Sequence, residues 1–110
     1  MKIKLDKYNS YVIKQNETYT LIDNTKLNNL VVSKTILHPK KNTTGHNHIG
    51  QEEVYQFMSG EGYIIVGDKE INVQAGDIVL IPAGYFHKVW NTSDIEDLIF
   101  VCVFDGKRSH

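Results

Sequence analysis

The sequence predicts an all-β fold, with short strands arranged as a small barrel or sandwich. Apolar and β-branched residues occur in short runs, and turn residues separate these runs at close spacing. Many short strands spaced in this way are typical of β-barrels and β-sandwiches. Helical periodicity is almost absent. The chain has 110 residues, the size of a domain with one hydrophobic core, so we expect residues 1–110 to form a single domain.

The first three strands are expected before residue 38. Tyr11–Ile13 and Thr18–Ile22 are short runs rich in aromatic and β-branched residues, which favour strands. Leu30–Leu37 is longer and follows the turn-forming pair Asn28-Asn29. A strand near the N-terminus leaves an unpaired sheet edge, so roughly the first 25 residues are expected to pair with a second subunit.

The next three strands are expected close together in the middle of the chain. Val54–Met58 and Gly62–Val66 are separated by glycine-containing turn residues. Glu70–Val73 follows one residue after the pair Gly67-Asp68, which is typical of a tight turn. We therefore expect a hairpin at Gly67-Asp68.

The last three strands complete the predicted fold. Ile78–Ile81 ends at the turn residues Pro82–Gly84, and His87–Trp90 follows them. Leu98–Phe104 is a continuous apolar run, so we expect this strand to be buried on both faces.

Composition excludes several classes of function. The net charge is −1, whereas general nucleic-acid binders carry an excess of Lys and Arg. No apolar run approaches the ~20 residues that span a bilayer, and the first residues lack the apolar region of a signal peptide. Cys102 is the only cysteine, so the chain cannot form an internal disulfide. We therefore expect a cytoplasmic protein with neither nucleic-acid nor membrane partners.

Three of the five histidines and one carboxylate have the spacing of a metal site. On a strand, His46 and His48 would point to the same face, about 6–7 Å apart. Glu53 follows a turn marked by Gly50 and can return to the same point, and His87 stands at the head of another strand. Three imidazoles and one carboxylate suit a divalent transition metal ion, with two octahedral positions left open. Fe, Mn, Ni, Co and Zn all accept such ligands.

The segments around these residues resemble the two motifs of the cupin superfamily. The two patterns are His46-x-His48-x4-Glu53-x6-Gly60 and Gly76-x5-Pro82-x-Gly84-x2-His87-x3-Asn91. The first motif thus lies at residues 46–60, and the second, at 76–91, matches at every defined position. The first motif usually begins with Gly six residues before its first His, and this chain has Lys40 there.

The resemblance implies a cupin-type jelly-roll β-barrel that holds the metal inside through His46, His48, Glu53 and His87. In its compact form the chain is similar to the small phosphomannose-isomerase-like cupins. Cupins are commonly dimers, so the resemblance also implies a homodimer. The family includes isomerases, epimerases, dioxygenases, decarboxylases, lyases and binding domains, so the fold does not decide the function.

The open metal positions favour a small-molecule substrate that offers two neighbouring oxygens. The metal can polarise a carbonyl and stabilise the negative charge that develops on its oxygen. We therefore expect an isomerase or epimerase of a phosphosugar or a related hydroxy-carbonyl compound. One alternative is a non-haem metal enzyme that acts on a small organic acid or diketone. It could be a dioxygenase, which is an oxidoreductase, or a decarboxylase or lyase. Another is a metal-binding or ligand-sensing domain without turnover.

Isomerisation also needs a base that moves a proton beside the carbonyl. His38 titrates in the useful pH range, and Tyr63 offers a hydroxyl, so these two residues are the catalytic candidates. Lys40 and Lys41 form a charged loop that can attract an anionic sugar.

Overall fold

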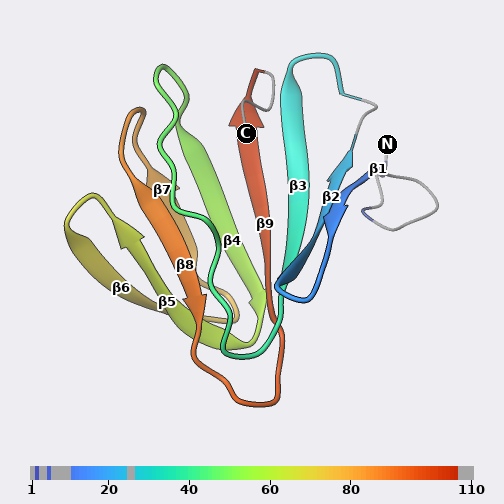
Figure 1. Ribbon diagram of the computed structural model, residues 1–110. Coiled ribbons are helices and arrows are strands. Elements are labelled where there is room, and N and C mark those ends of the chain that lie inside the picture. Colours follow the sequence, from blue (N-terminus) through green and yellow to red (C-terminus); the bar gives the residue numbers. More distant parts are fainter. Residues whose placement is uncertain (1, 3–4, 6–10, 25–26, 107–110) are drawn as a thin grey trace.

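The computed structural model describes residues 2, 5, 11–24 and 27–106, and its regular elements are all strands (Figure 1). Nine strands follow one another along the chain. They are β1 (Tyr11–Gln15), β2 (Tyr19–Asn24), β3 (Leu30–Leu37), β4 (Glu53–Ser59), β5 (Glu61–Val66), β6 (Lys69–Gln74), β7 (Ile78–Ile81), β8 (His87–Asn91) and β9 (Leu98–Asp105). The all-β prediction is confirmed, and every predicted strand is present with its ends shifted by at most two residues.

The strands form two antiparallel sheets that face each other as the walls of a jelly-roll barrel (Figure 1). The larger sheet has the order β1-β2-β3-β9-β4-β7, and the smaller sheet has the order β6-β5-β8. The predicted hairpin at Gly67-Asp68 joins β5 to β6, where Val66 pairs with Lys69. Among the described residues there is no helix that could cross a membrane.

The hydrophobic core lies between the two sheets. Inward-facing side chains of both sheets are almost completely buried, among them Phe57, Phe100 and Leu98 from the larger sheet and Ile64 and Val89 from the smaller one. Burial alternates along these strands because successive side chains point to opposite faces. The barrel interior is therefore apolar, apart from a polar group near the start of β4 and β8.

The expectation that β9 is buried on both faces is wrong. Leu98, Phe100, Cys102 and Phe104 are buried, whereas the residues between them are only partly buried. In the described part of the chain, the outward face of β9 is flanked by β3 and β4 but has no layer packed on it. Both faces are apolar in sequence, but only one of them faces the core.

The expectation that His46 and His48 lie on one strand is also wrong. Their segment belongs to the long β3–β4 connection, which pairs with β8 in isolated bridges, Asn42 with Trp90 and His46 with His87, and not as a regular strand. Between these bridges, the backbone N–H of Val89 donates to the hydroxyl of Thr43 at 3.0 Å. A side chain thus takes the place of a backbone carbonyl, which interrupts the ladder of hydrogen bonds.

Candidate metal centre

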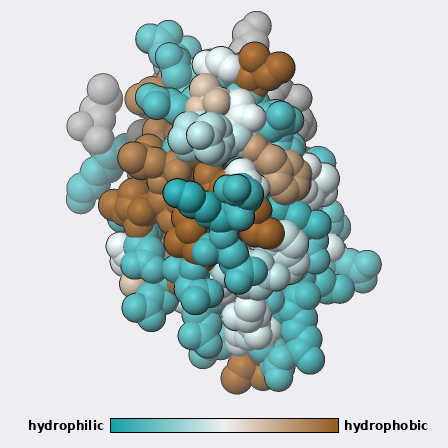
Figure 2. Space-filling view, turned by 90° about the vertical axis from the view of Figure 1, so that its left-hand side faces the viewer, coloured by the Kyte–Doolittle hydropathy of each residue, from teal (hydrophilic) through white to brown (hydrophobic). Residues whose placement is uncertain are grey.

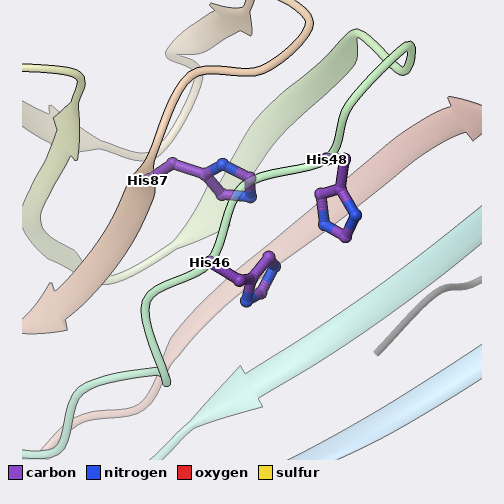
Figure 3. Close-up of side chains that lie close together, drawn as sticks. All are labelled: His46, His48 and His87. Carbon is purple, nitrogen blue, oxygen red and sulfur yellow. The ribbon is translucent and has the colours of Figure 1, made fainter.

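Three histidines from two separate elements meet inside the barrel (Figure 3). His46 and His48 come from the β3–β4 connection, and His87 is the first residue of β8. Two backbone hydrogen bonds join His46 to His87, with N···O distances of 3.2 and 3.0 Å. A further bond from the N–H of Gly84 to the carbonyl of His48, at 2.8 Å, holds the second histidine beside the same turn.

The three imidazole rings are close enough to share one ion. One ring nitrogen from each histidine lies within 4.8 Å of the others. The ring centroids of His46 lie 4.7 Å from His48 and 4.6 Å from His87. His48 and His87 are 4% and 2% exposed, so an ion held here would be shielded from bulk water. This group could therefore bind a metal.

Backbone carbonyls orient two of the rings. The Nδ1 atom of His87 lies 3.1 Å from the carbonyl oxygen of Tyr85, and the Nδ1 atom of His46 lies 2.9 Å from that of Thr44. A carbonyl only accepts hydrogen bonds, so each Nδ1 carries the proton and donates it. The lone pair of each ring is then on Nε2, which is the atom available to a metal ion.

Glu53, the first residue of β4, brings a buried carboxylate to the histidines. Its Oε1 atom lies 3.1 Å from Nε2 of His48 and 3.9 Å from Nε2 of His87, and the residue is 3% exposed. A carboxylate removed from water in this way needs a compensating positive charge. The sequence-predicted set of His46, His48, Glu53 and His87 is thus brought together at one place.

His87 cannot supply that positive charge at neutral pH. Burial is the main cause that lowers the pKa of His87 to about 4; His46 and His48 also lower it, and its hydrogen bond to Tyr85 has the opposite effect. Its Nε2 atom is buried and has no hydrogen-bond partner among the described residues. A neutral ring nitrogen beside a carboxylate fits a divalent cation, which would satisfy both groups.

A cavity of about 170 Å³ opens beside His46 and Glu53. Aromatic and aliphatic side chains form most of its wall, including Tyr55, Phe100 and Phe104. Residues that carry a hydroxyl group also line the cavity, namely Tyr19, Ser33, Thr35, Thr43 and Thr44. Cys102 also lines the cavity. The cavity can admit a small molecule with a few polar groups.

The cavity wall also includes Lys14 of β1, which sequence reasoning missed. No motif marks this lysine. Only the pairing of Lys14 with Leu21 of β2 brings it onto the inner side of the sheet.

The structure does not bring the candidate bases to this centre. His38 follows β3 at the end where Leu37 pairs with Leu98, whereas Glu53 pairs with Phe104 near the other end of β9. Leu98 and Phe104 are six positions apart along β9, which separates His38 from Glu53 by roughly 20 Å. His38 instead contacts Asp97, with 3.0 Å between Nδ1 and Oδ1. His38 therefore lies away from the three clustered histidines.

Tyr63 and Lys40 also lie away from the cavity. Tyr63 lies on the outward face of β5, where its ring stacks on Trp90 with 4.9 Å between centroids. Its inward neighbours on β5 are Gly62 and Ile64, which are buried. Lys40 makes an exposed ion pair with Asp94 at 3.2 Å, beyond the end of β3 and away from the cavity lining. Neither Tyr63 nor Lys40 lines the cavity.

Comparison with known proteins places the fold in a family. Residues 33–104 match the cupin domain. The oxalate-binding protein of Thermotoga maritima is 33% identical over 67 residues, which cover 61% of this chain and 54% of that protein. The glucose-6-phosphate isomerase of Thermococcus litoralis is 29% identical over 107 residues, which cover 86% of this chain and 56% of that protein. The chain thus spans about half the length of the curated relatives it matches.

A solved structure shows the same architecture. Oxalate decarboxylase of Bacillus subtilis, described with Mn(II) centres, superposes with a TM-score of 0.78 at 22% identity. The match covers 90% of this chain and 28% of that one. The matched family domain takes in both sequence motifs and the three clustered histidines. This chain belongs to the cupin family.

Proposed function

We propose that the chain holds one divalent transition metal ion through His46, His48 and His87, with the carboxylate of Glu53 as the fourth ligand. The observation that carries this proposal is the convergence of three ring nitrogens within 4.8 Å, beside a buried carboxylate. A bound divalent ion would polarise a carbonyl group and stabilise negative charge on its oxygen. Its identity is open among Fe, Mn, Ni, Co and Zn.

The residues of the chain prepare this centre before any ligand arrives. The carbonyls of Tyr85 and Thr44 fix the tautomers of His87 and His46. The carboxylate of Glu53 offsets one unit of the ion's charge, which leaves a net charge of about +1 with three neutral imidazoles. The aromatic wall of the cavity excludes water, which strengthens electrostatic contacts inside.

The first candidate reaction is isomerisation or epimerisation of a hydroxy-carbonyl compound. Such a reaction moves a proton beside a carbonyl, and the negative charge it creates gains more from a nearby cation than the neutral substrate does. The likeness to a glucose-6-phosphate isomerase over 86% of this chain supports a substrate of this class.

The second candidate is chemistry on a small organic acid, including decarboxylation or oxygen-dependent cleavage. The small volume and largely apolar lining of the cavity favour a compact acid over a whole sugar, whose many hydroxyls need partners. The likeness to an oxalate-binding protein supports the same class of ligand, and it also supports binding without turnover.

Metal analysis tests the centre itself. Protein purified without a histidine tag should hold about one equivalent of a transition metal, and the His46→Ala/His48→Ala double variant should lose it, because two of four ligands are gone. His38→Ala is the matched control, since His38 lies at the other end of β9. A double variant that keeps a full equivalent of metal contradicts the proposed centre.

Solvent exchange separates the two reactions. Metal-loaded protein is incubated in D₂O with sugar phosphates and keto-sugars, and in parallel the iron form is screened for O₂ uptake with small organic acids. Deuterium that enters the carbon beside the carbonyl, and is lost in Glu53→Ala, supports an isomerase. Substrate-dependent O₂ uptake without exchange supports the second candidate instead.

We also propose that two copies of the chain associate. On the outward face of the larger sheet, Val32, Val103, Val54 and Leu80 pair in one row across four strands. Leu80 is 69% exposed. Figure 2 shows hydrophobic side chains gathered together on one side of the molecule. An apolar row of this length favours contact with a second copy, because a continuous exposed apolar patch is typical of an interface.

A further inference from the structure

The cavity beside His46 and Glu53 adjoins an outer recess, and Lys14 lines both. Four residues line both spaces, namely Lys14, Tyr19, Thr43 and Thr44. We call this recess the mouth of the cavity.

This mouth carries positive charge and hydroxyl groups. Lys14 and Lys88 line it, and none of its described lining residues is acidic. The ammonium group of Lys88 makes a cation–π contact with Trp90, with Nζ 4.9 Å from the ring centroid. Lys14 is exposed and makes no ion pair with any described residue. The charge of Lys14 is thus available to a ligand.

A hydroxyl group that lines the same mouth is also able to donate. Thr43 Oγ1 accepts the backbone N–H of Val89 at 3.0 Å. A hydroxyl has one proton to give, and with its oxygen already accepting from Val89, that proton can turn toward the mouth. A flexible ammonium and a positioned hydroxyl together suit the oxygens of an anion.

We propose that Lys14 and Thr43 form a subsite for the carboxylate or phosphate of a ligand whose other end binds at the histidines. This proposal rests on the metal centre proposed above. The cavity volume of about 170 Å³ limits the part of the ligand inside. A dry cavity of roughly 150 Å³ holds benzene, so the inner part has about six non-hydrogen atoms. The ligand class is therefore a hydroxy or keto acid of three or four carbons with a second anionic group at its far end.

Matched probes test the charge requirement on metal-loaded protein. Malate is compared with malamate, whose distal carboxyl is an amide, and 3-phosphoglycerate is compared with glycerate, which lacks the phosphate. Dissociation constants are measured by calorimetry. The wild type should prefer the doubly anionic member of at least one pair by about tenfold, the effect of one hydrogen bond to a charged group. The pair that shows the preference identifies the anion as carboxylate or phosphate.

Two variants locate the preference. Lys14→Met keeps the aliphatic stem and removes the charge, so the preference should fall to about onefold while metal content stays unchanged. Lys34→Met is the matched control, because Lys34 is on the opposite face of the same sheet from its neighbours Ser33 and Thr35, which line the cavity. The control should keep the full preference.

Three results would overturn the subsite. They are an unchanged preference in Lys14→Met, an equal loss in Lys34→Met, and the absence of any charge preference in wild-type protein that holds its metal. Metal content is measured on the same samples. Protein that takes up no metal overturns the proposed function and the subsite with it, whereas metal-loaded protein without a charge preference overturns the subsite alone.

Discussion

The imidazole of His87 stays neutral at pH 7 because the fold removes it from water. Its side chain is 2% exposed, and burial is the main reason that its pKa falls from 6.5 to about 4. The hydrogen bond between the ring and the carbonyl of Tyr85 raises the pKa, but its effect is smaller than that of burial. A neutral ring is the form that binds a metal, so burial keeps His87 in the form that the proposed centre requires.

The metal-free protein should therefore lose stability on acidification. The unfolded chain takes up a proton on this residue near pH 6.5 and the folded chain only near pH 4, so stability rises with pH between these values. The loss at acid pH is at most about 3.5 kcal/mol, at about 1.4 kcal/mol per pKa unit. Denaturation in urea from pH 4 to 7 measures it. His87→Gln should flatten the slope, and an unchanged slope in that variant contradicts the assignment.

At the scale of elements, the β3–β4 connection carries most of the centre, and it begins with a left-handed residue. Lys40 has φ of 62°, the only positive value among the described non-glycine residues. This is the position where the first cupin motif usually has Gly. Its backbone N–H donates to the carbonyl of Ser93 at 3.0 Å, which keeps the turn in place against the steric cost of a Cβ atom.

Glycine at this turn should stabilise the protein relative to alanine. Lys40→Gly and Lys40→Ala both remove the exposed ion pair with Asp94, so their difference reports the backbone conformation alone. We expect Lys40→Gly to be more stable than Lys40→Ala by about 1 kcal/mol, because glycine has no Cβ to clash in the left-handed region. Thermal or urea unfolding measures the difference. An alanine variant as stable as the glycine variant would show that the turn is not strained.

At the scale of the whole molecule, the larger sheet packs its inner face on the core and presents an apolar outer face. Ile78 and Leu80 of β7 are 61% and 69% exposed, and β7 is one end of the sheet. The expectation that the N-terminal strands pair across a dimer stays a prediction. Most of residues 1–10, and residue 25, lie outside the described part of the chain. Within the chain, β1 pairs with β2 at the other end of the sheet.

Light scattering checks the association of two copies. The wild type should have the mass of a dimer at micromolar concentration, and the Ile78→Glu/Leu80→Glu variant should be a monomer, because four carboxylates would be brought into one interface. Ile95→Glu is the control, since Ile95 is 84% exposed in the loop before β9. Deletion of residues 1–16 tests the N-terminal alternative. A dimer that survives both changes excludes both surfaces.

Sequence by itself determined where the strands begin and end and which residue types gather for a metal. Turn residues are local signals, so Gly67-Asp68 marked its hairpin. The spacing of His46, His48, Glu53 and His87 was sufficient to predict that they meet, although not that their segment is irregular.

Tertiary structure alone decided which face of each strand looks inward and which end of the barrel each loop reaches. Tyr63 is on the outer face of β5, and His38 is at the far end of β3, since strand register and sheet order arise from pairings between distant segments. The same pairings bring Lys14 of β1 beside Thr43 at the mouth of the cavity. Local sequence patterns do not predict such contacts, because the contacts depend on how the whole chain folds around its core.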